Sequence, residues 1–123
     1  MTKPLDRLGK LVIQSLRDES FEFFEQLTQG HWEAPSLQKL QRDVRSLSPE
    51  QLEIVRRCVR SAVDEGIHSF LFALQEACEK KKLELRIQGD DVLDLTDGLH
   101  GELFTEDGWQ ARFSKFGEAP RED

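Results

Sequence analysis

A chain of 123 residues with 37% hydrophobic residues, eight Phe and two Trp can form one domain around a core, which excludes an intrinsically disordered protein. No apolar run approaches the ~20 residues of a membrane span, and polar residues interrupt the first segment, so we expect neither a membrane protein nor a secreted one. Residues 1–82 carry 13 basic and 13 acidic side chains, whereas residues 83–123 carry 4 basic and 11 acidic ones, so the net charge of −7 belongs to the C-terminal part. This negative charge would repel phosphates and argues against nucleic acid binding there.

The first 47 residues predict two amphipathic helices. Apolar residues recur at helical spacing from position 5 to position 27, and Gly30 is placed to end this first helix. The segment Asp18-Glu19-Ser20 could kink it. A second, shorter helix is indicated by apolar residues at positions 37, 40, 44 and 47.

A long helix is predicted over about residues 48–80. Ser48 can cap it, Pro49 suits its first position, and Gln51 completes a capping box. A line of small and apolar residues at steps of three and four follows, and we expect it to be buried: Leu52, Val55, Val59, Ala62, Gly66, Phe70, Ala73 and Ala77. The glycine within this line predicts close approach of another element at residue 66, and a break of the helix at this residue is the alternative.

The C-terminal part predicts strands. Residues 83–88 and 109–114 alternate between apolar and polar side chains, and Leu103-Phe104 can supply another short strand. A three-residue loop that pairs Ile87 with Leu93 keeps one face of the first hairpin apolar. We therefore expect an α+β fold in which the N-terminal helices pack on a C-terminal three- to four-stranded antiparallel meander. One domain, residues 1–123, would comprise a helical part (1–82), the sheet (83–116) and an acidic tail (117–123).

The C-terminal part also contains a signature made of three short motifs. It reads Asp-Gly-Leu-His-Gly-Glu-Leu at 97–103, Glu-Asp-Gly-Trp at 106–109 and Arg-Phe-Ser at 112–114, and residues 66–74 form a second apolar hallmark. With these motifs, residues 48–116 resemble small bacterial families of unknown function. The resemblance implies a bacterial origin and an α+β fold, and it implies no activity. Many bacterial proteins of this size and charge are immunity proteins that neutralise a toxin.

Two carboxylate-x-x-His units raise the alternative of a metal site. Glu65 and His68 would share one face of the long helix, and Asp97 and His100 lie in the later loop. Together they form a ligand set suited to Zn²⁺ or a harder divalent ion. Neither unit has the two-histidine spacing of metalloproteases, and we expect no metal and no other cofactor.

Nucleophilic catalysis finds no support in the sequence. It contains no GxSxG motif and no glycine-rich phosphate loop, and neither Cys58 nor Cys78 has a neighbouring His, so we expect no enzyme. The two cysteines lack metal-binding spacing and are predicted to be buried free thiols. A cytoplasmic protein is the expectation.

The charge distribution supplies the leading functional hypothesis, an acidic module that binds a basic protein, such as an immunity protein that blocks a toxin. Carboxylates on a rigid hairpin can occupy a cationic cleft, and complementary fields speed association. The residues expected to bind the partner are Asp90, Asp91, Asp94, Asp97, Glu102, Glu106, Asp107 and Trp109. Trp109 would serve only if exposed, and its alternation with Ala111 and Phe113 favours the core. The alternatives are a metal-dependent or otherwise catalytic domain around His68 and His100, and a structural homodimer that uses part of the apolar helical line.

Overall fold

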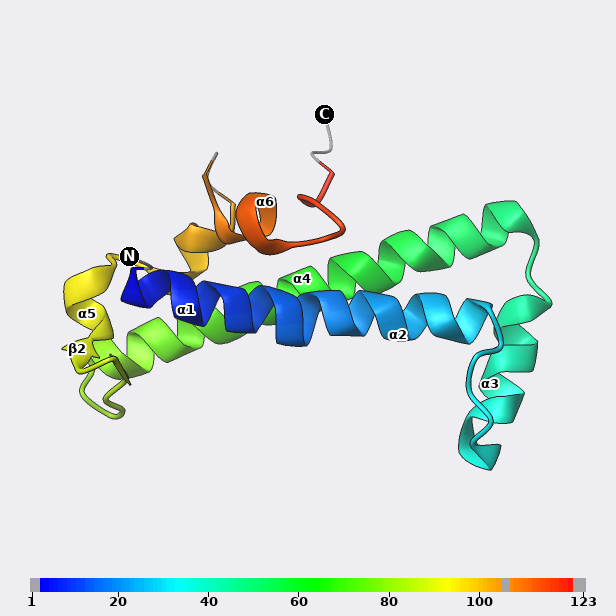
Figure 1. The fold of residues 1–123 in the computed structure, drawn as a ribbon, viewed down its shortest axis with the longest axis horizontal. Coiled ribbons are helices and arrows are strands. Elements are labelled where there is room, and N and C mark those ends of the chain that lie inside the picture. Colours follow the sequence, from blue (N-terminus) through cyan, green and yellow to red (C-terminus); the bar gives the residue numbers. More distant parts are fainter. Residues whose placement is uncertain (1–2, 105–106, 121–123) are drawn as a thin grey trace.

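The computed structural model describes residues 3–104 and 107–120, and most of these residues are helical. The helices are α1 (Pro4–Lys10), the π-helix η1 (Leu11–Asp18), α2 (Glu19–Thr28), α3 (Pro35–Arg45), α4 (Pro49–Glu79), α5 (Val92–Leu95), the 3₁₀-helix η2 (Leu99–Leu103) and α6 (Trp109–Phe113). The first three form one continuous rod that crosses α4, and α3 stands across one end of the pair (Figure 1). The C-terminal segment with η2 and α6 lies along one side of the two long helices (Figure 1).

The prediction of an α+β fold with a three- to four-stranded meander is wrong. Among the described residues the only sheet has two strands of two residues each, β1 (Arg86–Ile87) and β2 (Asp90–Asp91). Ile87 pairs with Asp90 rather than with Leu93. The two-residue turn between the strands holds Gln88 and Gly89 at φ values of 54° and 88°, the conformation that suits the twist of a tight hairpin.

The segments expected to extend the sheet are short helices. Asp91 accepts a hydrogen bond from the N–H of Leu93 at 2.9 Å and so caps α5 in place of a longer strand. In α6, the neighbours Trp109 and Gln110 are both buried, whereas Ala111 is exposed, so burial does not alternate as it would in a strand with one buried face. A run of five residues satisfies both periods, so tertiary contacts decide its structure.

Helix α4 begins as expected. The N–H of Gln51 donates to Oγ of Ser48 at 3.1 Å, and the N–H of Ser48 donates to Oε1 of Gln51 at 3.0 Å, which completes the capping box. The start of the helix is therefore fixed by short-range chemistry that the sequence displays.

The buried face of α4 differs from the predicted line. Its buried residues are Asp64, Ile67, Leu71, Gln75 and Cys78. In the middle of the predicted line, Ala62, Gly66, Phe70 and Ala73 are exposed, so the expectation that this line is buried is wrong there. A Cβ added to Gly66 would meet no atom within 4 Å, so close packing at residue 66 is also wrong.

Close packing occurs at Gly9 instead. A Cβ added to this residue would lie 2.6 Å from the indole ring of Trp109, which is 0% exposed. The glycine therefore allows α1 and α6 to touch. The surrounding core contains Ile13, Ile67, Leu71, Cys78, Val92, Leu99, Leu103 and Trp109. Cys58 is exposed, contrary to the expectation for both thiols.

A buried polar network holds the C-terminal segment against both long helices. Arg17, only 2% exposed, donates from Nε to Oδ1 of Asp64 at 2.5 Å and from Nη1 to Oγ of Ser114 at 2.9 Å. The hydroxyl of Ser114 donates to Asp18 at 2.6 Å. Arg17 also donates to the carbonyl of Gly117 at 2.7 Å, so the segment expected to be a tail is attached where it begins. These bonds satisfy groups that would be costly to bury alone.

Candidate functional site

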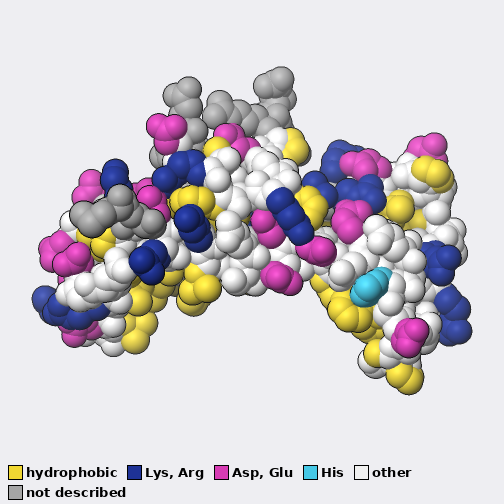
Figure 2. Space-filling view, viewed as in Figure 1, with side chains coloured by type: hydrophobic (Ala, Val, Ile, Leu, Met, Phe, Trp, Pro, Cys, Tyr) yellow, Lys and Arg dark blue, Asp and Glu magenta, His cyan; other side chains and the backbone are white. Residues whose placement is uncertain are grey.

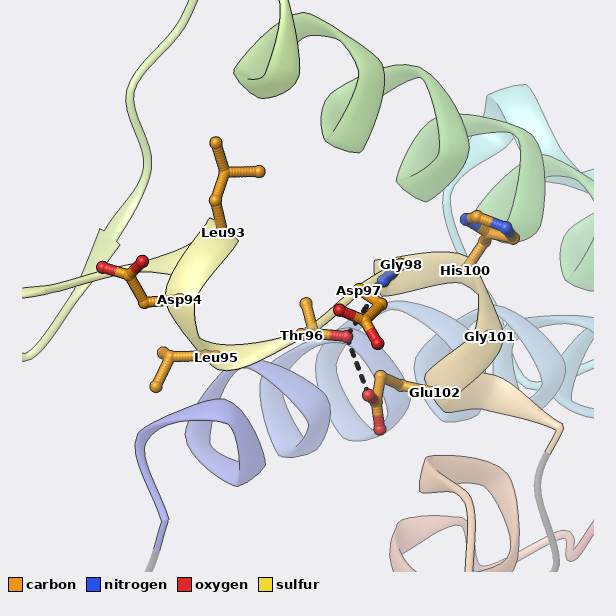
Figure 3. A pocket seen from close by; sticks show the side chains of 9 residues that line it. All are labelled: Leu93, Asp94, Leu95, Thr96, Asp97, Gly98, His100, Gly101 and Glu102. Carbon is orange, nitrogen blue, oxygen red and sulfur yellow. Dashed lines mark hydrogen bonds between the residues drawn. The ribbon is translucent and has the colours of Figure 1, made fainter.

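An open depression lies on the acidic loop, which we define as residues 90–102. The depression has a volume of about 600 Å³ and is lined by Leu93, Asp94, Leu95, Thr96, Asp97, Gly98, His100, Gly101 and Glu102 (Figure 3). It lies at the end of α4 that carries α5 (Figure 1). The acidic loop therefore supplies all the walls of this depression.

Three buried side chains anchor the acidic loop and the start of the next segment to the core. Val92 and Leu99 are 0% exposed, and Leu103 is 1% exposed. The N–H of Leu99 also donates to Oε1 of Gln75 on α4 at 3.1 Å, which satisfies a buried amide on each side. The loop is thus held in one place while its polar side chains face outward.

Thr96 organises the middle of the depression. Its hydroxyl donates to a carboxylate oxygen of Glu102 at 2.8 Å and accepts from the N–H of Gly98 at 3.2 Å. Figure 3 shows Thr96, Asp97 and Glu102 directed toward the same space, whereas Asp94 points away on the other side of α5. The structure therefore brings Asp97 and Glu102 together and leaves Asp94 at the rim.

The residues that line the depression carry only negative charge, whereas arginines near its carboxylates are paired with other acidic side chains. The nine lining residues include three carboxylates and neither Lys nor Arg. At the edges, the pKa of Arg112 is raised by its hydrogen bond to Asp6 and further by the charges of Asp107 and Glu102. The pKa of Arg86 is raised by its hydrogen bond to Glu84, with a smaller contribution from Asp94. Figure 2 accordingly shows acidic and basic side chains interspersed over this end of the molecule.

The other residues expected to bind a partner are placed differently. Asp90 and Asp107 are exposed, whereas Asp91 is partly buried and is engaged in capping α5. Glu106 lies outside the described residues. Trp109 is fully buried against Gly9, so it cannot anchor a partner, in agreement with the interpretation of its alternation as core.

The two histidines of the metal alternative meet in space. The rings of His68 and His100 have centroids 5.4 Å apart in an edge-to-face arrangement, and Phe72 and Phe104 pack on the same pair. Glu65, however, accepts a hydrogen bond from Ser69 at 3.1 Å. Within residues 3–104 and 107–120, no group of three or more His, Cys, Asp or Glu side chains is arranged to hold a metal ion.

The sequence analysis did not predict two features of this region. The aromatic side chains of Phe72 and Phe104 pack on the histidine pair, Phe104 on His68 and Phe72 on His100. The Arg17 network ties the Arg-Phe-Ser motif to the rod, so Ser114 has a structural role in this signature. An arginine within an apolar helical stripe was the available signal for that network.

Comparison with known proteins adds no relative: no family description, no curated protein and no solved structure matches this chain. The resemblance to small bacterial families therefore stays a prediction. Over the described part of the chain, every helix falls short of the length or the hydropathy required to cross a membrane.

Proposed function

We propose that this protein is a non-catalytic binding module whose acidic loop docks on a basic surface of another protein. The observation that carries the proposal is the depression bordered by Asp94, Asp97 and Glu102, with neither Lys nor Arg in its lining. Such a surface attracts a cationic partner and increases the rate of encounter. A toxin with a basic catalytic cleft, neutralised by an immunity protein, is one partner of this chemistry.

The anchoring of the acidic loop supports the same proposal. Val92 and Leu99 hold the loop backbone in the core, so the carboxylates lose little conformational freedom on binding. The bond from Thr96 to Glu102 restricts one of the carboxylates further. A preorganised acidic surface gains more affinity from each contact than a mobile one.

The proposal places the protein in the cytoplasm. Its two cysteines, Cys58 and Cys78, are free thiols, and one of them is exposed. Free thiols persist in a reducing compartment, whereas small secreted domains rely on disulfides. The compartment is tested by fractionation of host cells.

The test compares two variants that lose the same charge at opposite ends of the molecule. The first combines Asp94→Asn, Asp97→Asn and Glu102→Gln. The control combines Glu33→Gln, Asp43→Asn and Glu50→Gln, three exposed carboxylates near α3. A partner captured from host lysate by the wild-type protein is purified, and its association rate is measured across a salt series.

The acidic-loop variant should bind at least about tenfold more weakly, mainly through slower association, and should lose much of the salt dependence. The control should keep the affinity and salt dependence of the wild-type protein. Equal affinity of the acidic-loop variant and the wild type, or a larger loss in the control, would contradict the proposal.

A further inference from the structure

An apolar groove lies open between α2 and α4. It forms because the rod crosses α4, so the two helices diverge toward α3 (Figure 1). The groove has a volume of about 440 Å³ and is lined by Glu19, Ser20, Phe23, Phe24, Leu27, Val59 and Val63. Phe24 and Leu27 are each 5% exposed, whereas Phe23 is 41% exposed. The groove therefore has a packed floor and an exposed aromatic edge.

The opposite side of this helix pair is covered by the chain itself. Phe116 of the C-terminal segment packs on Phe21 with ring centroids 5.4 Å apart. Nε of Arg56 donates to Glu25 at 2.9 Å and so links α4 to α2. Glu25 lies two residues after Phe23, about 200° around α2, so these contacts are on the far side from the groove.

Both walls of the groove carry side chains at the same spacing. Each set follows positions i, i+4, i+7 and i+11, with Leu16, Ser20, Phe23 and Leu27 on the rod and Val59, Val63, Gly66 and Phe70 on α4. Positions at this spacing lie within about 60° of one another around a helix, so each set faces one way. Leu16 and Phe70, which continue the walls toward the crossing, are 46% and 61% exposed. At Gly66 an added Cβ would meet no atom of the described chain within 4 Å, which leaves room within the groove.

The shape of the groove fits an α-helix. Eleven residues separate the ends of each wall, which is about 17 Å of helix, so an occupant of about twelve residues, or about three turns, fills this length. An amphipathic helix binds such a groove through apolar side chains at positions i, i+3, i+4 and i+7. An extended segment fits less well, because it binds through its backbone to the edge of a sheet, and two helices offer no such edge.

Charge beside the groove decides what this helix carries. Among the described residues that line the groove, the charged one is Glu19, which is exposed. Glu65 is exposed beside the other wall, on the same side of α4 as Ala62, three residues earlier. A second copy of this chain would bring these carboxylates toward one another, whereas Lys or Arg on both flanks of a helix would pair with them.

We propose that the groove between α2 and α4 binds a cationic amphipathic helix of about three turns that belongs to another protein. The apolar side of that helix lies on Phe23, Val59 and Val63, and its Lys or Arg side chains lie beside Glu19 and Glu65. The acidic loop contributes no residue to this groove, so the inference goes beyond the proposed function and does not depend on it.

The first test titrates the protein with a defined peptide. The probe is a fluorescein-labelled helical peptide of about fourteen residues, with Leu at positions i, i+3, i+4 and i+7, Lys on both flanks and no aromatic residue. Fluorescence anisotropy should show saturable binding below about 1 mM. A peptide with Glu in place of Lys has the same apolar stripe and should bind at least about tenfold more weakly.

The second test locates the binding with matched variants. Phe23→Ser removes the aromatic edge and should weaken binding of the Lys peptide at least about tenfold. Ile54→Ser, at an apolar position of α4 that is 53% exposed and lies outside the lining of the groove, should bind as the wild type does.

The third test separates the charges at the groove from those elsewhere. Glu19→Gln with Glu65→Gln should weaken binding about threefold or more and reduce its salt dependence. Glu33→Gln with Asp43→Asn, two exposed carboxylates near α3, is the control and should keep the affinity. The acidic-loop variant should also keep the affinity within about twofold, because its charges are outside the groove.

Nuclear magnetic resonance adds a readout that needs no variant. The ring of Trp32 packs on Phe23 with centroids 5.8 Å apart, whereas Trp109 is fully buried against Gly9. The Lys peptide should therefore shift the indole N–H signal of Trp32 and leave that of Trp109 in place.

Four results would overturn the proposal. They are absence of peptide binding up to about 1 mM, equal affinity of Phe23→Ser and the wild type, a larger loss in the acidic-loop variant than in Glu19→Gln with Glu65→Gln, and an unmoved Trp32 signal at saturation. Sedimentation equilibrium tests the other occupant, since self-association that Phe23→Ser abolishes would assign the groove to a second copy of the chain. Thermal unfolding checks that each variant is folded.

Discussion

Carboxylates occur in two contrasting regions of this molecule. In the Arg17 network, Asp18 and Asp64 are buried and bonded to a guanidinium, a hydroxyl and a backbone amide. In the acidic loop, Asp94 and Asp97 are exposed, and neither Lys nor Arg lines the depression beside them. The same side chain therefore contributes to the fold in one region and remains available to a partner in the other, and the difference lies in what faces it.

The largest expected effect is at Asp64. Asp64→Ala leaves the cation of Arg17 buried at 2% exposure without its bidentate acceptor. We expect a loss of about 3–5 kcal/mol in the free energy of unfolding, measured by chemical denaturation. Glu65→Ala, at the exposed neighbouring position, should change stability by less than about 0.5 kcal/mol. Similar losses in the two variants would show that the network contributes little.

The next effect is at Ser114, which links Arg17 to Asp18. Ser114→Ala removes the hydroxyl that donates to Asp18 and accepts a hydrogen bond from Arg17. We therefore expect the free energy of unfolding to fall by about 1–3 kcal/mol. Limited proteolysis should also cleave the segment after residue 114 faster in this variant. Ser61→Ala, at an exposed position on α4, is the matched control, and equal protection of both variants would contradict the role of Ser114.

A smaller effect is expected at Asp6, whose setting is intermediate between the two regions. A hydrogen bond from Arg112 at 2.7 Å lowers the pKa of Asp6. Because the folded pKa lies below the unfolded one, the pair stabilises the protein above about pH 4, and this contribution is lost as pH falls through the lowered pKa. Asp6→Asn should therefore cost less than about 1 kcal/mol at pH 7 and nothing in strong acid. Unfolding curves at a series of pH values check the prediction, and a cost that is independent of pH would contradict it.

The smallest effect on stability is expected in the acidic loop. Asp94→Asn with Asp97→Asn should change the free energy of unfolding by no more than about 0.5 kcal/mol, with a gain favoured because like charges no longer repel. Thermal unfolding measures this change. A loss above about 1 kcal/mol would mean that these carboxylates hold the loop together and would remove the contrast between the two regions.

The sequence predicted those parts of the fold that depend on short-range chemistry. The start of α4 follows from Ser48, Pro49 and Gln51, which lie next to one another and act on one helix end. The buried face of α4 depends on Asp64 and Gln75, whose partners Arg17 and Leu99 are 47 and 24 residues away. Hydrophobicity alone therefore selects the wrong side of this helix.

The candidate site was predictable in part for the same reason. Asp94 and Asp97 are charged residues in the acidic part of the chain, and both are exposed, as expected of side chains that bind a partner. Which carboxylates share a depression depends on how Val92, Leu99 and Leu103 attach the loop to α4, which no local pattern reveals. The helix at Trp109 was missed because five residues fit both a strand and a helix.

The attachment of the C-terminal segment to the rod also orders events during synthesis. Arg17 and Ser114 are 97 residues apart, and Asp6 and Arg112 are 106 residues apart. At about 5–20 residues per second, a ribosome adds Ser114 about 5–20 s after Arg17. During that interval the nascent rod has no Trp109 to pack against Gly9. The slow step of folding should therefore be the late return of the C-terminal segment, and a nascent chain stalled before residue 109 should bind chaperones more than a completed one.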